Sequence, residues 1–409
     1  MPSINLRWFL IFGALIASTG YIYSTFTGSL GMVLFCFGYL CNIKKISFLG
    51  FFQSKKFWAP ILFFSITVVF LFHSNNISQG LEDISRVLPL FIYPIIFGTT
   101  KPFNLKENRF ITKGFSLAVL IFLVICLAVA IFRQVQFSIE GGPFNWYFFY
   151  RFDFLKIFDQ HPTYIGMYTL LAIVFIIDKS LNLFKNDWVK WLLFLSFSFF
   201  ILILGSRICY GIYLILVGLF IYKAYHKQSL KVKLKAVATT IICLIVLGVI
   251  CLQIPIIKER IYYTIGVNYD YQYNDSNSIK NSNDIEQGRM LLWSDAFVAI
   301  KEQPFYGHGT GSGKRVLRSV YEKNGHTSFL EKDYNTHSTY LETWLEGGFI
   351  LLGSYVWMLF LLLKGSKSYT ILGFFLIIVL ASFTETLFLS KGLLFLSFFY
   401  CYFIRQSNE

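Results

Sequence analysis

Three short segments of the chain carry side chains that bind negative charge or move a proton. Arg207 lies in LGSRICYG, Arg289 in EQGRMLLW and His337 in NTHSTYL. An arginine presents a planar fork of N–H donors that matches a phosphate group in bidentate fashion. A histidine exchanges a proton near neutral pH. These residue types are typical of a site that holds an anionic head group and deprotonates a hydroxyl group.

Two further segments extend this set. His161 in QHPTYIG lies before an apolar run, as His337 does. The glycine segment PFYGHGTGSGKR hints at a phosphate loop, but it lacks the G-x-x-x-x-G-K-[ST] pattern because Arg315 follows Lys314. It therefore indicates either a flexible turn or a loop that shapes a substrate cleft, with Gly309 as a substrate-contacting position.

The acidic candidates are weaker. Glu82 and Asp83 lie close to Arg86, but two adjacent carboxylates are a poor signature of a metal site. Glu342 and Glu346 share one helix face, where either could orient the His337 imidazole or cap a helix. We expect neither a metal nor a cofactor.

The elements that position these residues are predicted to be membrane helices. The chain has 409 residues, of which 56% are hydrophobic, 20% aromatic and only 14% charged. Repeated apolar runs of roughly 15 to 20 residues indicate about twelve transmembrane helices in an all-α polytopic protein. The expected spans are 7–26, 28–43, 57–73, 84–98, 114–132, 161–177, 188–204, 207–222, 236–254, 344–363, 370–383 and 388–404.

The distribution of charge predicts the orientation of these spans. The net charge is +14, and most basic residues outside 255–343 lie on the side that carries both termini. By the positive-inside rule that side is cytoplasmic, so the basic balance reports topology and a nucleic-acid partner is excluded. We expect three regions: helices one to nine at 1–254, a large periplasmic loop with the site motifs at 255–343, and helices ten to twelve at 344–409. Residues 133–160 form a smaller outer segment.

Other features place short helices in the large loop. Asp284 and Gln287 fit a capping box before a helix at 285–301, and Thr336 or Ser338 can cap the helix that follows. All seven cysteines lie in or beside apolar runs, so no disulfide or zinc pattern is expected.

In combination these motifs resemble the O-antigen ligase and polymerase superfamily of bacterial envelope biogenesis. GSR at 205–207 resembles its outer-face arginine motif, and GRMLLWSDAFVAIKEQPFYGHGTGSG resembles its loop helix with the glycines that follow. NTHSTYLETWLEGGFILL resembles its histidine motif, although Ser338 replaces the usual Asn. HPTYIG at 161–166 is similar to the family segment at the start of span six.

The resemblance implies a GT-C-type glycosyltransferase of the inner membrane. Its donor would be a glycan on undecaprenyl diphosphate, its acceptor lipid A core or another glycan, and its surroundings membrane lipids. Arg207 and Arg289 would hold the diphosphate, and His337 would be the base for direct, inverting transfer. His161, Trp293 and Gly309 are the further substrate-binding candidates.

Three alternatives remain open at this stage. A repeat-unit polymerase belongs to the same superfamily, and its members often have two sizeable outer loops. Relatives also glycosylate proteins. A lipid-linked oligosaccharide flippase is a different class, which usually contains internal repeats and mid-membrane charges that this sequence does not display by eye. The ligase is the preferred interpretation.

Each candidate residue can also be interpreted without a function. Arg207 can be a cation at the membrane interface, Arg289 a solvated helix end and His337 a surface residue.

Overall fold

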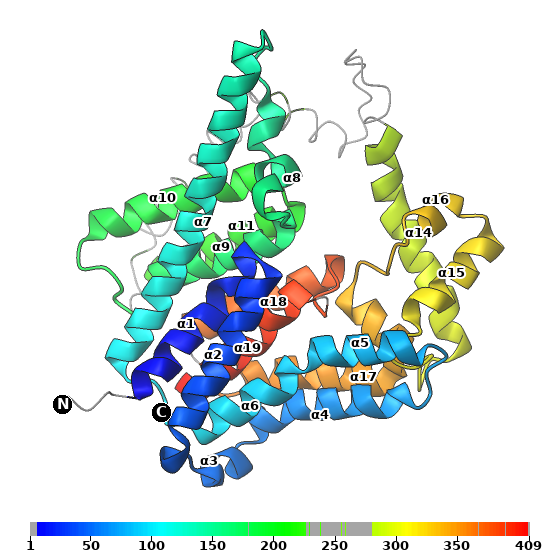
Figure 1. Cartoon of the computed structure of the whole chain (residues 1–409), viewed down its shortest axis with the longest axis horizontal. Coiled ribbons are helices and arrows are strands. Elements are labelled where there is room, and N and C mark those ends of the chain that lie inside the picture. The colour runs from blue at the N-terminus through cyan, green and yellow to red at the C-terminus, as the bar shows by residue number, and fades with distance from the viewer. Residues whose placement is uncertain are drawn as a thin grey trace.

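The computed structural model describes residues 6–225 and 280–407, apart from Lys179, Lys367 and Leu389, together with the isolated positions 229, 238, 255 and 258. In this part the chain is helical and contains no strand (Figure 1), so the expected all-α class is confirmed there. The expected ninth span at 236–254 and most of the polar segment 268–284 lie outside the described residues.

The first two helices, α1 (Arg7–Tyr23) and α2 (Thr25–Cys41), form a tight hairpin. A Cβ atom added at Gly13 would lie 2.6 Å from the Cα of Phe35, so the glycine allows the two backbones to approach. Such small-residue crossings are typical of helix packing in membranes. The expected spans 7–26 and 28–43 are therefore two helices, which meet at Ser24.

The next helices surround the end of this hairpin. They are η1 (Ile43–Lys45), α3 (Phe48–Gln53), α4 (Lys55–Leu71), α5 (Ile77–Val87), α6 (Pro89–Thr99) and α7 (Leu105–Ile139). The structure divides the expected span 84–98 between α5 and α6. Pro89 occupies the first position of α6, where its missing N–H is tolerated. The polar residues of α5 thus form a separate amphipathic helix rather than the start of a span.

The middle of the chain folds back on itself at a glycine. Its elements are η2 (Trp146–Phe149), α8 (Arg151–Phe154), η3 (Lys156–Phe158), α9 (Pro162–Ile177), α10 (Asp187–Leu204) and α11 (Arg207–Tyr225). α9 is buried along nearly its whole length. Gly205 ends α10 with φ +62°, and a Cβ there would lie 2.5 Å from the Arg151 side chain. Glycine therefore permits the reversal from which α11 begins at Arg207.

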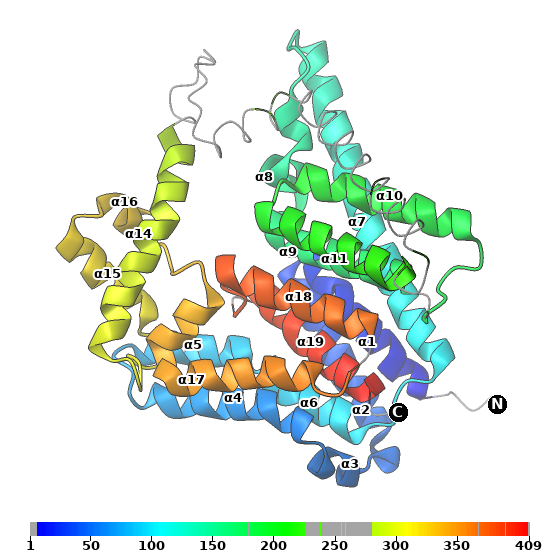
Figure 2. The same cartoon turned by 180° about the vertical axis from the view of Figure 1, so that it is seen from behind.

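The C-terminal third contains the loop helices and the last long helices. They are α14 (Lys280–Glu302), α15 (Gly313–Asn324), α16 (Thr327–Glu331), α17 (Thr339–Leu363), α18 (Tyr369–Thr384) and α19 (Ser390–Ser407). In both views α14, α15 and α16 gather at one end of the molecule, next to α5 and α17 (Figures 1 and 2). Ala296, Tyr321 and Leu345 belong to the small apolar core that joins these helices to the start of α17.

The predicted helix starts had different outcomes. Ser338 is the N-cap of α17 and accepts a hydrogen bond from the Leu341 N–H at 3.5 Å, as expected. The predicted start after Asp284 is wrong, because α14 begins at Lys280. The helix therefore begins within the polar stretch that precedes Asp284.

Length and composition support a membrane protein. In the described residues, α7, α10 and α17 are long and apolar enough to cross a membrane, and α2, α9 and α18 are shorter apolar helices. α10 also exposes large apolar side chains, including Trp188 and Leu195. An exposed apolar stripe of this kind is expected where a helix faces lipid rather than water. The number of about twelve spans stays a prediction.

Candidate functional site

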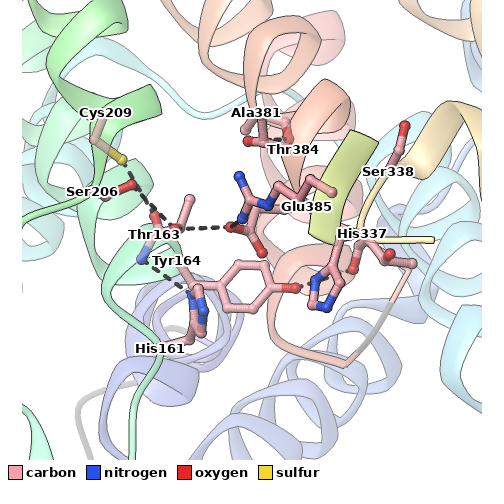
Figure 3. A network of polar contacts seen from close by, with 12 residues as sticks. His161, Thr163, Tyr164, Ser206, Cys209, His337, Ser338, Ala381, Thr384 and Glu385 are labelled. Atoms are coloured by element: carbon pink, nitrogen blue, oxygen red, sulfur yellow. Dashed lines mark hydrogen bonds and ion pairs between the residues drawn. The ribbon is translucent and has the colours of Figure 1, made fainter. Parts of the chain in front are cut away.

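Two of the predicted motifs meet where α9 begins. His161 is the N-cap of α9, and its Nδ1 accepts a hydrogen bond from the Thr163 N–H at 3.3 Å. The Thr163 hydroxyl oxygen lies 3.1 Å from that of Ser206 (Figure 3). HPTYIG at 161–166 and GSR at 205–207 are therefore in direct contact, although more than 30 residues separate them in the sequence.

Glu385 joins this contact to the large loop. The Thr163 hydroxyl donates a hydrogen bond to Glu385 Oε1 at 3.0 Å, and Arg289 Nη2 lies 3.8 Å from the same oxygen. Glu385 is only 6% exposed. Burial raises the pKa of this carboxyl to about 7, against the opposing effects of the Arg289 charge and the Thr163 hydrogen bond. The carboxyl consequently takes up a proton at a higher pH than a solvent-exposed glutamate does.

The histidine motif is held at this point from two sides. Thr339 donates two hydrogen bonds to the Glu385 carbonyl oxygen, from its N–H at 3.0 Å and from its hydroxyl at 2.7 Å. The Trp293 indole N–H donates to the Thr336 carbonyl at 3.1 Å. His337 lies between these anchors, with a backbone φ of +46°. A side chain in this left-handed region is uncommon and is tolerated where the surroundings fix it.

The environment of His337 sets its charge. Burial lowers the pKa of the imidazole to about 4, and repulsion by the Arg289 cation adds to the decrease. At neutral pH the ring is therefore uncharged and keeps one nitrogen lone pair. A neutral imidazole next to a cation can accept a proton once an anion neutralises that cation.

The predicted residues fall into two groups. His161, Arg289 and His337 are close to one network (Figure 3), and exposed Arg207 follows directly on Ser206 at the first position of α11. Trp293 supports the backbone of the histidine segment through its indole N–H.

Gly309 occupies a different environment from that network. Its added Cβ would lie 2.6 Å from the Ser74 backbone, and its N–H donates to the Glu346 carbonyl at 2.8 Å. The contacts that the structure shows for Gly309 are with protein backbone. These contacts explain why position 309 is a glycine, because the α4–α5 turn and α17 pack too closely there for a side chain.

Sequence reasoning missed Glu385 and Thr163. Glu385 is a lone carboxylate between the apolar runs 370–383 and 388–404, and an ionisable residue at such a place is a functional candidate by default. That signal was available in the sequence. Thr163 lies inside the HPTYIG motif, but its hydroxyl gains meaning only from its contacts with Glu385 and Ser206.

The acidic pair on α5 is engaged with an arginine. Arg86 Nη1 lies 2.8 Å from Asp83 Oδ1, and Arg86 also pairs with Glu82. Among the residues that the structure describes, no group of three metal-binding side chains occurs. Glu82 and Asp83 thus neutralise the positive charge of Arg86 in this structure.

In the part of the chain that the structure describes, an all-helical fold with membrane-protein composition holds a polar network between α14, the start of α9 and the end of α18. Residues 191–356 match the model of the O-antigen ligase family, and this segment contains Arg207, Arg289 and His337. This part of the chain is therefore similar to the O-antigen ligase family.

The chain is also similar to a protein of Haemophilus influenzae described as "Uncharacterized protein". The two are 24% identical over 359 residues, which cover 85% of this chain and 80% of that protein. The similarity therefore extends well beyond the segment that matches the family model.

Proposed function

We propose that this protein transfers a glycan from undecaprenyl diphosphate to lipid A core at the periplasmic face of the inner membrane, without a metal. The observation that carries the proposal is the convergence of Arg289, Glu385 and His337 at the contact between the HPTYIG and GSR motifs. The donor sugar already carries a diphosphate leaving group, so no nucleotide is needed outside the cytoplasm.

Positive charge at the site would stabilise the leaving group. Negative charge develops on the diphosphate as its bond to the sugar breaks, and preorganised cations stabilise such charge. Arg289 is present in the network, and Arg207 begins α11 beside Ser206. A carboxyl group with a pKa near 7 can stay protonated beside a bound diphosphate, so Glu385 need not repel it.

Proton transfer would use His337. The acceptor hydroxyl oxygen attacks the anomeric carbon, the carbon–oxygen bond to the phosphate breaks, and that electron pair leaves with undecaprenyl diphosphate. The hydroxyl proton passes to the neutral imidazole. Because Arg289 is one cause of the low pKa of His337, a diphosphate that neutralises Arg289 would raise this pKa. Donor binding would thus make His337 a better base, and direct attack would invert the anomeric centre.

The proposed topology follows from the charge distribution. Both termini and most basic loops would be cytoplasmic, and the described loop helices α14, α15 and α16 would be periplasmic. α7, α10 and α17 have the length and composition of spans. In the proposed orientation the site would lie at the outer face.

A repeat-unit polymerase is the second candidate, and one observation favours it. The smaller outer segment 133–160 is folded into η2, α8 and η3, and the Phe152 ring lies 5.2 Å from that of His161. If both segments are on the outer side, as proposed, two structured outer segments contact the site, which is expected for a polymerase that holds two glycans.

Reconstituted transfer distinguishes these functions. The purified protein is incubated with undecaprenyl-diphosphate glycan in the presence of EDTA. One reaction also contains lipid A core as the acceptor, and the other contains only the donor. Transfer to lipid A core supports the ligase, whereas a ladder of products on the donor alone establishes the polymerase. An Arg207→Ala variant that retains full transfer in either assay would remove Arg207 from the mechanism.

A further inference from the structure

A second polar pocket lies close to the network described above. It is enclosed by α4, α5, α17, the glycine segment and the turn between α18 and α19. Its polar lining includes Asp83, Arg86, Lys314, Glu342, Glu346 and Thr386. No step of the proposed reaction uses these side chains.

The cations of this pocket are already paired with other carboxylates. Arg86 pairs with Asp83 at 2.8 Å and also with Glu82, whereas Lys314 Nζ lies 2.7 Å from Asp333 Oδ2. Within the described part of the chain, Glu342 and Glu346 belong to no ion pair. Two glutamate side chains therefore line the pocket without taking part in an ion pair of the described residues.

Protein donors satisfy only part of these two carboxylates. Glu342 Oε2 accepts hydrogen bonds from the Thr336 N–H at 3.3 Å and from its hydroxyl at 2.6 Å. Glu346 accepts from backbone N–H groups of Gly311 and Gly313. A carboxyl group offers more hydrogen-bonding positions than these contacts use, whether it is ionised or protonated. Both glutamates thus keep capacity for further hydrogen-bond donors.

The hydroxyl group of Thr386 is an independent observation that points to a ligand in this pocket. Its side chain lines the pocket and is 4% exposed, yet its hydroxyl oxygen has no hydrogen-bond partner in the described residues. Buried hydroxyl groups are nearly always hydrogen-bonded, and an exception calls for an explanation. A bound molecule that exchanges a hydrogen bond with Thr386 would provide one.

The apolar part of the pocket narrows the chemistry of that molecule. Phe63 and Phe388 stack with ring centroids 4.8 Å apart, and both line the pocket. Ligand sites commonly combine aromatic walls with a few polar groups that fix orientation. A sugar ring offers C–H groups to an aromatic wall and hydroxyl donors to carboxylates.

We propose that this pocket binds one sugar residue of a glycan substrate, with hydroxyl groups bonded to Glu342, Glu346 and Thr386. This inference rests on the proposed glycosyltransferase function and assigns part of its substrate site. The pocket is connected to the reactive centre through two of its lining residues. Asn335 Oδ1 accepts a hydrogen bond from the His337 N–H at 2.9 Å, and Thr386 directly follows Glu385. The sugar can come from the donor glycan or from the acceptor.

Steady-state kinetics identify the source. The full-length protein in detergent is assayed as wild type, Glu342→Gln, Glu346→Gln and Thr386→Val, with Glu322→Gln on exposed α15 as the matched control. Loss of one hydrogen bond to a charged group should raise the KM of one substrate about tenfold. The kcat and the other KM should stay within about twofold. The substrate whose KM rises is the one whose sugar occupies the pocket.

The Thr386→Val variant guards against a folding artefact. It replaces a hydroxyl that makes no hydrogen bond in the described residues, so it should fold as the wild type does. If the wild type transfers glycan but both KM values stay unchanged in all three pocket variants, the pocket proposal is overturned while the proposed function stands.

A binding measurement separates the opposite failure. Free oligosaccharide released from the donor by mild acid is titrated into each protein, and tryptophan fluorescence is followed. Saccharide binding that weakens about tenfold in the pocket variants supports the pocket even if no transfer is detected. That result would overturn the proposed function alone. A wild type that neither binds saccharide nor transfers it would overturn both.

Discussion

The glycine segment 307–313 and the histidine segment 335–339 both match family motifs, yet they are built differently. In the glycine segment, positive φ angles and close backbone contacts explain why glycines are present. At Gly311, for example, an added Cβ would lie 2.2 Å from the Gly80 nitrogen. In the histidine segment, the positive charge of Arg289 lowers the pKa of His337 and also acts on the pKa of Glu385. The first segment is a packing element, and the second presents chemical groups.

The difference shows how a motif should be interpreted. His308 lies among the glycines, and its buried ring nitrogen Nε2 is 2.9 Å from the Ala299 carbonyl oxygen, which fixes α14 to the glycine segment. His337 is held instead by backbone contacts on both sides of it. We therefore expect a structural role for His308 and propose a chemical role for His337, and variants can separate these roles.

Gly311→Ala should have the largest effect and should act on folding. The residue has φ +81°, and the new methyl group would meet Gly80 backbone. We expect a loss of more than about 3 kcal/mol in the free energy of unfolding, measured by denaturation in detergent. Gly325→Ala is the matched control, because it has φ +73° but no atom within 4 Å of the added Cβ. It should lose only about 1 kcal/mol. Equal losses in the two variants would show that close packing is not what the glycine segment requires.

Arg289→Gln should act on transfer rather than on folding. Removing a preorganised group that stabilises transition-state charge costs about 10²–10³-fold in rate, or roughly 3–4 kcal/mol. The single-turnover transfer rate measures this effect. Lys301→Gln, at an exposed position near the end of the same helix, should leave the rate within about twofold. A Lys301 variant as slow as the Arg289 variant would indicate general disruption of α14.

Glu385→Gln should remove a pH dependence of stability. The folded pKa is about 7 and the reference value is 4.5. A carboxyl group whose pKa is raised on folding stabilises the fold below its unfolded value, and this contribution is lost as pH rises through the folded value. Wild-type stability should therefore fall between about pH 4.5 and 7, by up to roughly 3 kcal/mol. The variant should show a flatter profile in thermal unfolding between pH 5 and 8. Parallel profiles would contradict the assigned burial of Glu385.

Arg318→Gln should have the smallest effect. Arg318 Nη1 lies 3.7 Å from Asp333 Oδ1, and both side chains are about half exposed. An exposed ion pair contributes under about 1 kcal/mol and less at high salt. Unfolding and transfer should both be close to wild type. A tenfold loss of transfer would show that α15 belongs to the reactive site after all.

The sequence predicted the helical class, the N-cap at Ser338 and the proximity of Arg289 to His337, because these depend on local pattern and on motif. Three features required three-dimensional information. Leu88 separates α5 from α6 within what reads as one apolar run, and α14 starts before the predicted cap. The contact of Thr163 with Glu385 joins residues 222 positions apart, so no local pattern reports it. The environment of Gly309 likewise depends on α4 and α17, which are distant in the chain.

The most direct test of the account compares the two histidines in one assay. Single-turnover transfer is measured per folded molecule for wild type, His337→Ala and His308→Ala, below the unfolding temperature of each. Loss of a positioned base costs about 10²–10⁴-fold in rate, so His337→Ala should be slower by that factor. His308→Ala should lose stability but keep a rate within about threefold of wild type. A His337→Ala variant with the wild-type rate, or equal rate losses in both variants, would contradict the assignment of the reactive centre to His337.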